Sequence, residues 1–262
     1  MEQLKERKVK GQLPPAKAGS FHAKNFMILY KLTDSKRETY GNFKWELGKK
    51  HEKPIITSPQ LCSKEVFHAY RNLNLALILN PIHADIRSPL LFKAEGEIIT
   101  EDWGKVGCKS LTLTEQLELP EWYVDKKLQL KVLCQFAILC AEAVLEYFEF
   151  KFPNDDRPRK AIEAAKAYIK NPNVAADAAD AAAKAAYVAY AAASAASAAA
   201  NAADVAASAA SVAAYAAAHA AADVAYVAYA AASAAANAAD VAAIDFSLMA
   251  DKAVKIMLEE SR

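Results

Sequence analysis

The chain has 262 residues, which is enough for one large domain or two small ones. Its 32 Lys and Arg residues nearly cancel its 31 Asp and Glu residues, so the total charge excludes neither an acidic nor a basic partner. The charge is unevenly spread, because residues 1–50 hold twelve basic and five acidic side chains. The amino terminus lacks the apolar core of a signal peptide, which favours a cytoplasmic protein.

Residues 1–24 mix charged side chains with Gly and Pro, and this composition predicts a flexible basic arm. Short apolar or alternating runs then predict strands at 26–32, 39–47 and 54–56. Residues 64–79 predict a helix that is capped by Ser63 and followed by a loop between Pro81 and Pro89.

A strand, a hairpin and a second strand are predicted at residues 90–100, Trp103-Gly104 and residues 109–113. All seven glycines of the chain precede residue 108. Because glycine suits the turns between strands, residues 25–123 are expected to form a small α+β domain that is rich in β-structure.

After about residue 124 the apolar spacing changes to three and four, which is the period of a helix. Helices are predicted at 125–152, at 162–169 and at 244–258. Between them, 44 of the 70 residues in 174–243 are alanine, the strongest helix former. Residues 124–262 are therefore expected to form an alanine-rich all-α bundle, in which two similar helices carry the repeated Tyr-Val-Ala-Tyr of 187–190 and 226–229.

A charged turn between two of these helices is a candidate binding site. It contains Asp155, Asp156, Arg157 and Arg159 around a proline. Such a cluster serves either as a recognition loop or as a helix cap with local ion pairs, and capping is the favoured interpretation.

No sequence pattern names a reaction. Phosphate-loop, dinucleotide, nucleophile-elbow and zinc-protease signatures are absent, and no Cys/His spacing predicts a metal site. Glu95 and Glu97 place two carboxylates on one face of a strand, which suits acid–base chemistry but more simply forms a solvated hairpin edge. His68 and His219 are further candidate polar contacts. We expect no catalytic residues, no metal and no cofactor.

The helical part resembles a family of immunity proteins that occur in bacterial toxin–immunity loci and in phages. The similarity covers residues 130–243 and includes Cys140-Ala-Glu142-Ala-Val-Leu145 and the segment DDRPRKAIEAA at 155–165. The resemblance implies an all-helical binding protein without established catalytic residues.

Residues 26–119 more faintly resemble an uncharacterised phage and bacterial domain. The matching residues are Glu46-Leu47-Gly48, Val66-Phe67-His68-Ala69-Tyr70 (GFHAC in that domain) and Gly104-Lys105-Val106. The order of strands also resembles half of an ADP-ribosyltransferase fold, although the first strand lacks the arginine of that fold.

These patterns favour a non-enzymatic, cytoplasmic inhibitor of a phage or bacterial conflict system, one that neutralises a toxin or defence component. One alternative is an N-terminal domain that binds or sequesters a nucleotide, or acts as an ADP-ribosyltransferase, through His68, Glu95 or Glu97. Another is a structural protein that forms homo-oligomers through its alanine-rich helices. Neither a membrane nor nucleic acid is an expected partner.

Overall fold

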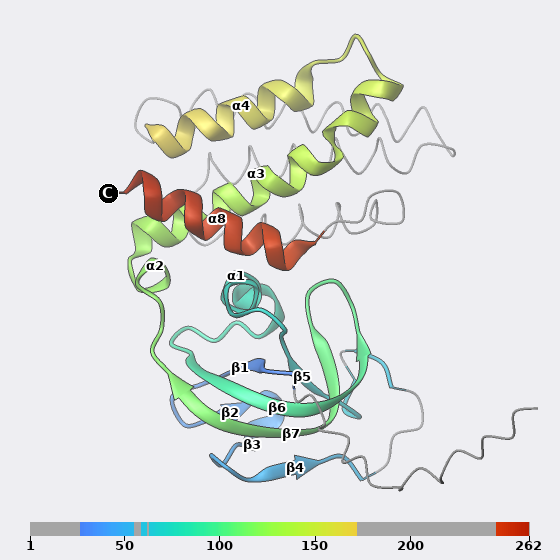
Figure 1. The fold of residues 1–262 in the computed structure, drawn as a ribbon, viewed down its shortest axis with the longest axis vertical. Coiled ribbons are helices and arrows are strands. Elements are labelled where there is room, and N and C mark those ends of the chain that lie inside the picture. The colour runs from blue at the N-terminus through green and yellow to red at the C-terminus, as the bar shows by residue number, and fades with distance from the viewer. Residues whose placement is uncertain (1–26, 55–58, 62, 172–244, 262) are drawn as a thin grey trace, which may run out of the picture.

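The computed structural model describes residues 27–54, 59–61, 63–171 and 245–261 (Figure 1). These residues form a β-rich half and a helical half, so the predicted α+β class is confirmed. The predicted arm at 1–24 and the alanine-rich region at 174–243, which includes His219, lie outside the described residues.

Five antiparallel strands form the main sheet. They are β1 (Leu29–Thr33), β4 (Lys50–Glu52), β5 (Phe67–Ala69), β6 (Leu90–Glu101) and β7 (Val106–Leu117). The order is β1-β6-β7-β4, and β5 also pairs with β7. Reciprocal backbone hydrogen bonds of 2.8 and 2.9 Å between Tyr30 and Tyr70 join β1 to the end of β5. The strands therefore curl into a small barrel, which occupies the lower half of Figure 1.

Alternation along β1 assigns its side chains to two different cores, since successive residues of a strand face opposite sides. Leu29 packs in the barrel with Trp45, Phe92 and other buried residues. Leu32 packs on the outside of the barrel, against the helices. The predicted strand at 26–32 and the predicted β6–β7 hairpin are thus confirmed, and β7 is longer than the sequence indicated.

Residues 39–47, predicted as one strand, form a short hairpin instead. It consists of β2 (Glu38–Thr39), a 3-10 turn (Tyr40–Asn42) and β3 (Phe43–Lys44). Gly41 and Asn42 both have positive φ values, of 74° and 58°, and this left-handed backbone breaks the strand. Strand β4 (Lys50–Glu52) was not predicted, and the expected strand at 54–56 falls largely on residues 55–58, which lie outside the described part.

The predicted helix at 64–79 is wrong in its first half. Phe67 and Ala69 point into the barrel core as part of β5, because pairing with β7 overrides local helix propensity. Helix α1 (Leu73–His83) starts later, and its cap is Asn72, whose Oδ1 accepts a hydrogen bond of 2.8 Å from the Leu75 N–H. The helix also continues through Pro81, where a loop was expected.

The helical half contains α2 (Glu121–Val124), α3 (Lys126–Lys151), α4 (Arg157–Lys170) and α8 (Phe246–Glu260), so the three helices predicted around the alanine region are confirmed. Helix α3 is buried on all sides from Phe136 to Ala141, as expected for a helix that is apolar all round. Helices α4 and α8 pack against α3, and α8 also packs against α1.

One hydrophobic core joins the outside of the barrel to the helices. It includes Leu32 of β1, Leu79 of α1, Phe136 of α3 and Phe246 of α8. The predicted domain boundary between residues 123 and 124 falls within α2, whose Trp122 is part of this core. The division into domains 25–123 and 124–262 stays a prediction. In the described part of the chain, no helix is both long enough and apolar enough to cross a membrane.

Candidate functional site

The charged turn predicted from the sequence connects the end of α3 to the start of α4, at the upper right of Figure 1. Asp155 accepts hydrogen bonds of 2.8 and 2.6 Å from the Arg157 guanidinium and one of 3.1 Å from the Arg157 backbone N–H. The paired guanidinium lowers the pKa of the Asp155 carboxyl. Asp155 therefore closes a local turn onto Arg157, the first residue of α4, whereas Asp156, the N-cap residue of that helix, makes no side-chain cap hydrogen bond.

A second arginine of the turn ties α4 back to α3. The Arg159 guanidinium donates to both carboxylate oxygens of Glu149, at 2.7 and 2.6 Å. About two turns further along α4, Lys166 pairs with Glu142 of α3 at 2.9 Å. The planar, two-point contact between Arg159 and Glu149 fixes the orientation of the two side chains as well as their distance. The two helices are thus fastened at the turn and again along their length.

The end of α3, the turn and the first turn of α4 together form a corner, which we call the α3–α4 corner (residues 149–160). Two of its features project outward. Asp156 and Lys160 form an exposed ion pair of 2.8 Å within the first turn of α4. Phe150, near the end of α3, has 91% of its surface exposed. Phe150 was not among the residues predicted from the sequence to form a site. Its spacing could have marked it as exposed. Phe148 continues the apolar stripe of the helix, and a side chain two positions later points away from that stripe.

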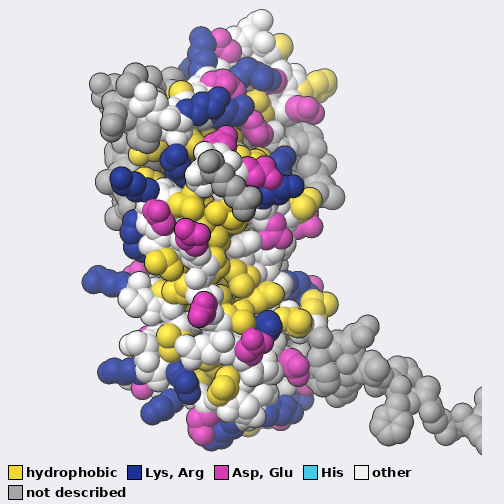
Figure 2. Space-filling view, turned by 60° about the vertical axis from the view of Figure 1, so that its left-hand side comes forward, with side chains coloured by type: hydrophobic (Ala, Val, Ile, Leu, Met, Phe, Trp, Pro, Cys, Tyr) yellow, Lys and Arg dark blue, Asp and Glu magenta, His cyan; other side chains and the backbone are white. Residues whose placement is uncertain are grey.

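Exposed apolar side chains also occur elsewhere. Figure 2 shows hydrophobic side chains gathered at mid-height of the displayed face, where the helices meet the strands, with charged side chains above and below. Helix α2 lies at this junction and contributes the exposed Val124. The corner is the stronger candidate, because it combines an exposed aromatic ring with charged side chains that are held by fixed contacts.

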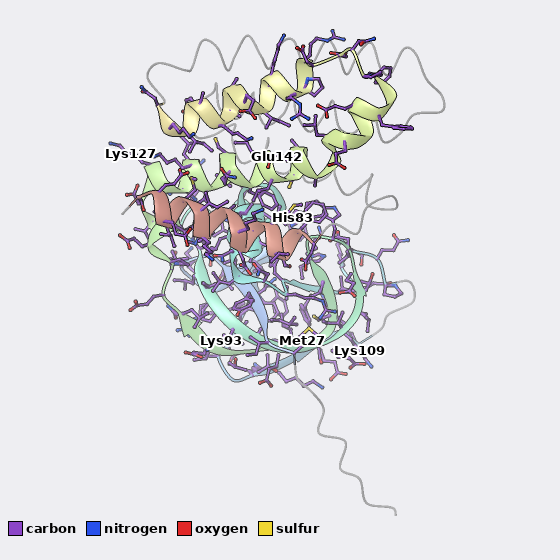
Figure 3. The ribbon with its side chains drawn as sticks, turned by 45° about the horizontal axis from the view of Figure 1, so that its top comes forward. Met27, His83, Lys93, Lys109, Lys127 and Glu142 are labelled. Carbon is purple, nitrogen blue, oxygen red and sulfur yellow. The ribbon has the colours of Figure 1, made fainter. Side chains whose placement is uncertain are left out.

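The remaining candidate residues lie on the barrel. Glu95 and Glu97 are exposed on β6, opposite Thr112 and Ser110 of β7. Figure 3 shows this end of the molecule, with Lys93 and Lys109 on the strands and Glu142 well away on α3.

His68 is half-buried on β5, opposite Gly107 of β7. Burial, with added repulsion from Lys31 and Lys105, lowers the pKa of the His68 imidazole to about 4. Along β7, His68 lies opposite Gly107, whereas Glu95 and Glu97 lie opposite Thr112 and Ser110. The structure therefore places His68 at a different position along the sheet from the two glutamates that were the other candidates for nucleotide chemistry.

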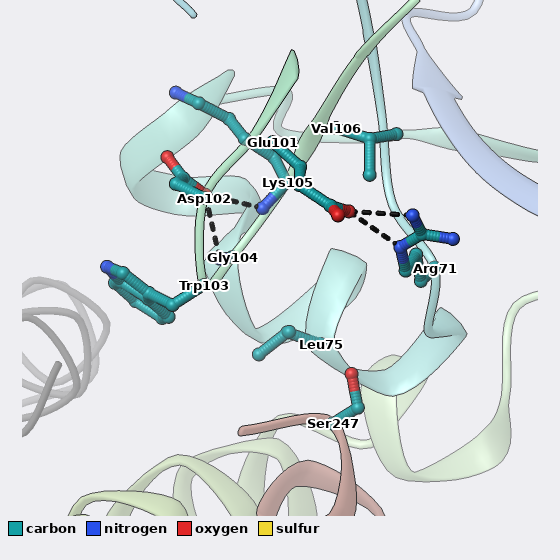
Figure 4. Close-up of a pocket in the computed structure, with 9 residues that line it drawn as sticks. All are labelled: Arg71, Leu75, Glu101, Asp102, Trp103, Gly104, Lys105, Val106 and Ser247. Carbon is teal, nitrogen blue, oxygen red and sulfur yellow. Dashed lines mark hydrogen bonds and ion pairs between the residues drawn. The ribbon is translucent and has the colours of Figure 1, made fainter. Parts of the chain in front are cut away.

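A small pocket lies between the β6–β7 turn, α1 and the start of α8 (Figure 4). Arg71 pairs with Glu101 on one side of it, and the Asp102 carboxylate accepts hydrogen bonds from the backbone N–H groups of Gly104 and Lys105 on the other. Its volume of about 40 Å³ is far below the roughly 300 Å³ or more of a pocket for a drug-sized ligand. It suits a few water molecules.

Metal and disulfide chemistry find no support in the described part of the chain. No group of three His, Cys, Asp or Glu side chains there could hold a metal ion. Cys108, Cys134 and Cys140 are free and buried, and burial raises the pKa of each thiol. Buried thiols with raised pKa values are unreactive.

Comparison with known proteins finds a match for the helical part. Residues 126–251 match a family model described as "Imm-5 like putative immunity protein". The match begins at the first residue of α3, contains the α3–α4 corner and ends within α8. It confirms the resemblance to an immunity-protein family that the DDRPRKAIEAA segment indicated. No curated protein and no solved structure matches the chain.

Proposed function

We propose that this chain is a non-enzymatic binding protein that neutralises a bacterial toxin or defence component, and that the α3–α4 corner contacts this partner. An immunity-type family implies a toxin-neutralising role in general terms. The observation that carries the specific proposal is Phe150, which is 91% exposed at a corner that lies within the matched residues.

The physical support is the combination of rigidity and exposure. Large aromatic side chains and arginines contribute most of the binding energy at protein interfaces. A backbone that is already held in place loses less conformational entropy on binding than a mobile one. At this corner the Arg159–Glu149 and Arg157–Asp155 pairs hold the backbone on both sides of the turn, next to Phe150.

Charge adds specificity to the same surface. Asp156 and Lys160 pair with each other while remaining exposed, with 62% and 71% of their side-chain surfaces in solvent. A partner with complementary charges can contact both, and charge reversal would oppose that contact. We therefore include these two side chains in the proposed contact surface.

The test is a pull-down from a bacterium that encodes the neighbouring toxin or defence genes. The wild-type protein is compared with F150A, with the double charge reversal D156K/K160E, and with Y40A. Tyr40 is a matched control, because it is 93% exposed and lies on the barrel at the other half of the molecule. Rescue of growth from the captured protein then tests neutralisation.

The proposal predicts that the wild type and Y40A retain one specific protein and protect the cell, whereas F150A and D156K/K160E lose both properties. If the wild type captures no protein, or captures one whose toxicity it does not suppress, the proposed function is wrong. If F150A and D156K/K160E bind and protect like the wild type, the corner is not the contact surface.

A further inference from the structure

The barrel contains a buried lysine that the proposed function does not use. Lys31 lies on β1 with only 8% of its surface exposed. Its Nζ donates a hydrogen bond of 2.6 Å to the backbone oxygen of His68 and lies 5.3 Å from the centre of the Trp45 ring. Lysines are almost never fully buried unless they are paired, so this side chain requires an explanation.

A carboxylate does not supply that explanation. The groups that act electrostatically on Lys31 are the Cys108 thiol and the Lys53 ammonium, and no Asp or Glu is among them. Lys53 follows β4, is half-buried, and has its Nζ 4.4 Å from the centre of the Phe67 ring. In the part of the chain that the structure describes, neither lysine forms an ion pair, and Lys53 acts on Lys31 by repulsion.

A third polar group, on the strand β4, lies against the same tryptophan ring. The Nε2 atom of His51 is buried and has no hydrogen bond among the described residues. The His51 ring packs edge-on against Phe43 and Trp45, with ring centres 5.1 Å apart in each case. Trp45 thus touches both His51 and Lys31. Buried polar atoms nearly always have a hydrogen-bond partner, and an orphan often marks the place of a bound water or ligand.

We propose that Lys31, Lys53 and His51 form a binding site for a phosphoryl group at the aromatic end of the barrel. An anion would compensate the two lysine charges and accept a hydrogen bond from the orphan His51 nitrogen. Lysine binds phosphate as a compact point charge, and a phosphoryl group has enough oxygens to meet three donors. The half-buried Phe43 at the rim offers an apolar wall for a larger group attached to the phosphate.

This site is independent of the α3–α4 corner, because it lies in the β-rich half and outside the residues matched by the immunity-type family. It gives the β-rich half a ligand class through residues other than His68, Glu95 or Glu97. The phosphoryl group can belong to free phosphate or to a nucleotide, and the experiment separates these sources.

The test is isothermal titration of the full chain with inorganic phosphate and, separately, with AMP, at constant ionic strength. The variants are K53A and K31M, and the control is K93A. Lys93 is a good control because it lies on β6 of the same barrel and already pairs with Glu115 at 2.6 Å. Circular dichroism establishes that each variant is folded.

We expect the wild type and K93A to bind at least one probe, K53A to bind about tenfold or more weakly, and K31M to show no binding. Tighter binding of AMP than of phosphate identifies the source as a nucleotide, and equal or weaker binding identifies free phosphate. The proposal is overturned if neither probe binds the wild type, or if K53A binds like K93A. Should K31M fail to fold, the comparison of K53A with K93A decides.

Discussion

Arg159 and Glu149 join the first turn of α4 to the end of α3 through two hydrogen bonds of 2.7 and 2.6 Å. They lie ten residues apart in the sequence, on either side of the turn at 152–156. The neighbouring Lys160–Asp156 pair has a similar length of 2.8 Å but lies within the start of α4. The Arg159–Glu149 pair therefore connects two helices, whereas the Lys160–Asp156 pair lies within the start of one helix. The effect of each pair on the end of α3 can be measured.

Replacing Arg159 by alanine should loosen the corner without unfolding the helices. We expect faster backbone hydrogen exchange at the end of α3 and in the first turn of α4, because the contact between the two helices is lost. K160A is the matched control and should leave exchange at the end of α3 unchanged, because its ion pair does not reach that helix. Equal effects of R159A and K160A on the end of α3 would contradict the assignment of Arg159 as the link.

Helix α1 provides a second test, at the place where sequence and structure disagree. The Asn72 side chain caps this helix, whereas Ser63, the predicted cap, only accepts a hydrogen bond of 3.2 Å from the Glu65 N–H. N72A should lower the free energy of unfolding by about 1 kcal/mol, the usual cost of removing an N-cap. S63A should have a clearly smaller effect in the same urea titration. If S63A costs as much as N72A, the assignment of the cap is wrong.

Elements with a long repeated apolar pattern could be predicted from the sequence, whereas the short strand β5 could not. Long periodic segments such as α3, and the β6–β7 hairpin with its turn, were predicted because their apolar spacing is repeated many times. The three residues of β5 repeat nothing, and Phe67 and Ala69 are assigned to a strand only by their pairing with Cys108 and Val106 of β7.

The candidate sites could likewise be predicted only where their residues lie close together in the sequence. The charged residues of the α3–α4 turn stand together in the sequence, so their importance could be predicted, but the Glu149 partner of Arg159 was not identified in advance. Lys31 was missed because a lysine in a strand normally indicates the exposed face. Its burial depends on the closure of β1 onto β5, a contact between residues about 40 positions apart that no local pattern indicates.

The two histidines near the β6–β7 turn predict sensitivity to acid. Burial lowers the pKa values of His68 and His83 to about 4, and repulsion from Lys105 adds to the effect. Because these folded-state values lie below the ordinary value of 6.5, the unfolded chain binds more protons between pH 6.5 and 4. Stability should therefore fall as the pH is lowered through this window.

The measurement is the denaturation midpoint from pH 7 to pH 4.5 for the wild type and for H68Q/H83Q. The double variant should lose less stability over this range, even if its midpoint at pH 7 is lower. Tyr70 donates to or accepts from His83 Nδ1 at 3.2 Å, so glutamine, which retains hydrogen-bonding capacity, is preferable to alanine. Parallel midpoint curves for the two proteins would show that other groups cause the loss.

Lys31 should change stability in the same direction, but at alkaline pH. Burial lowers the pKa of its ammonium group from 10.5 to about 8, so the folded chain holds fewer protons than the unfolded chain between these values. Stability therefore rises with pH across this window, by about 3 kcal/mol for a shift of this size. Below pH 8 the protein carries the full cost of burying the charged amine.

K31M should remove this dependence. We expect the difference in free energy of unfolding, wild type minus K31M, to increase by about 3 kcal/mol between pH 7 and pH 10.5 in phosphate-free buffer. Other groups that titrate in this range, such as the Cys108 thiol whose pKa burial raises to about 11, are present in both proteins and largely cancel. A difference that stays constant with pH would mean that Lys31 is solvated in the folded protein, and it would remove the physical basis of the phosphoryl site as well.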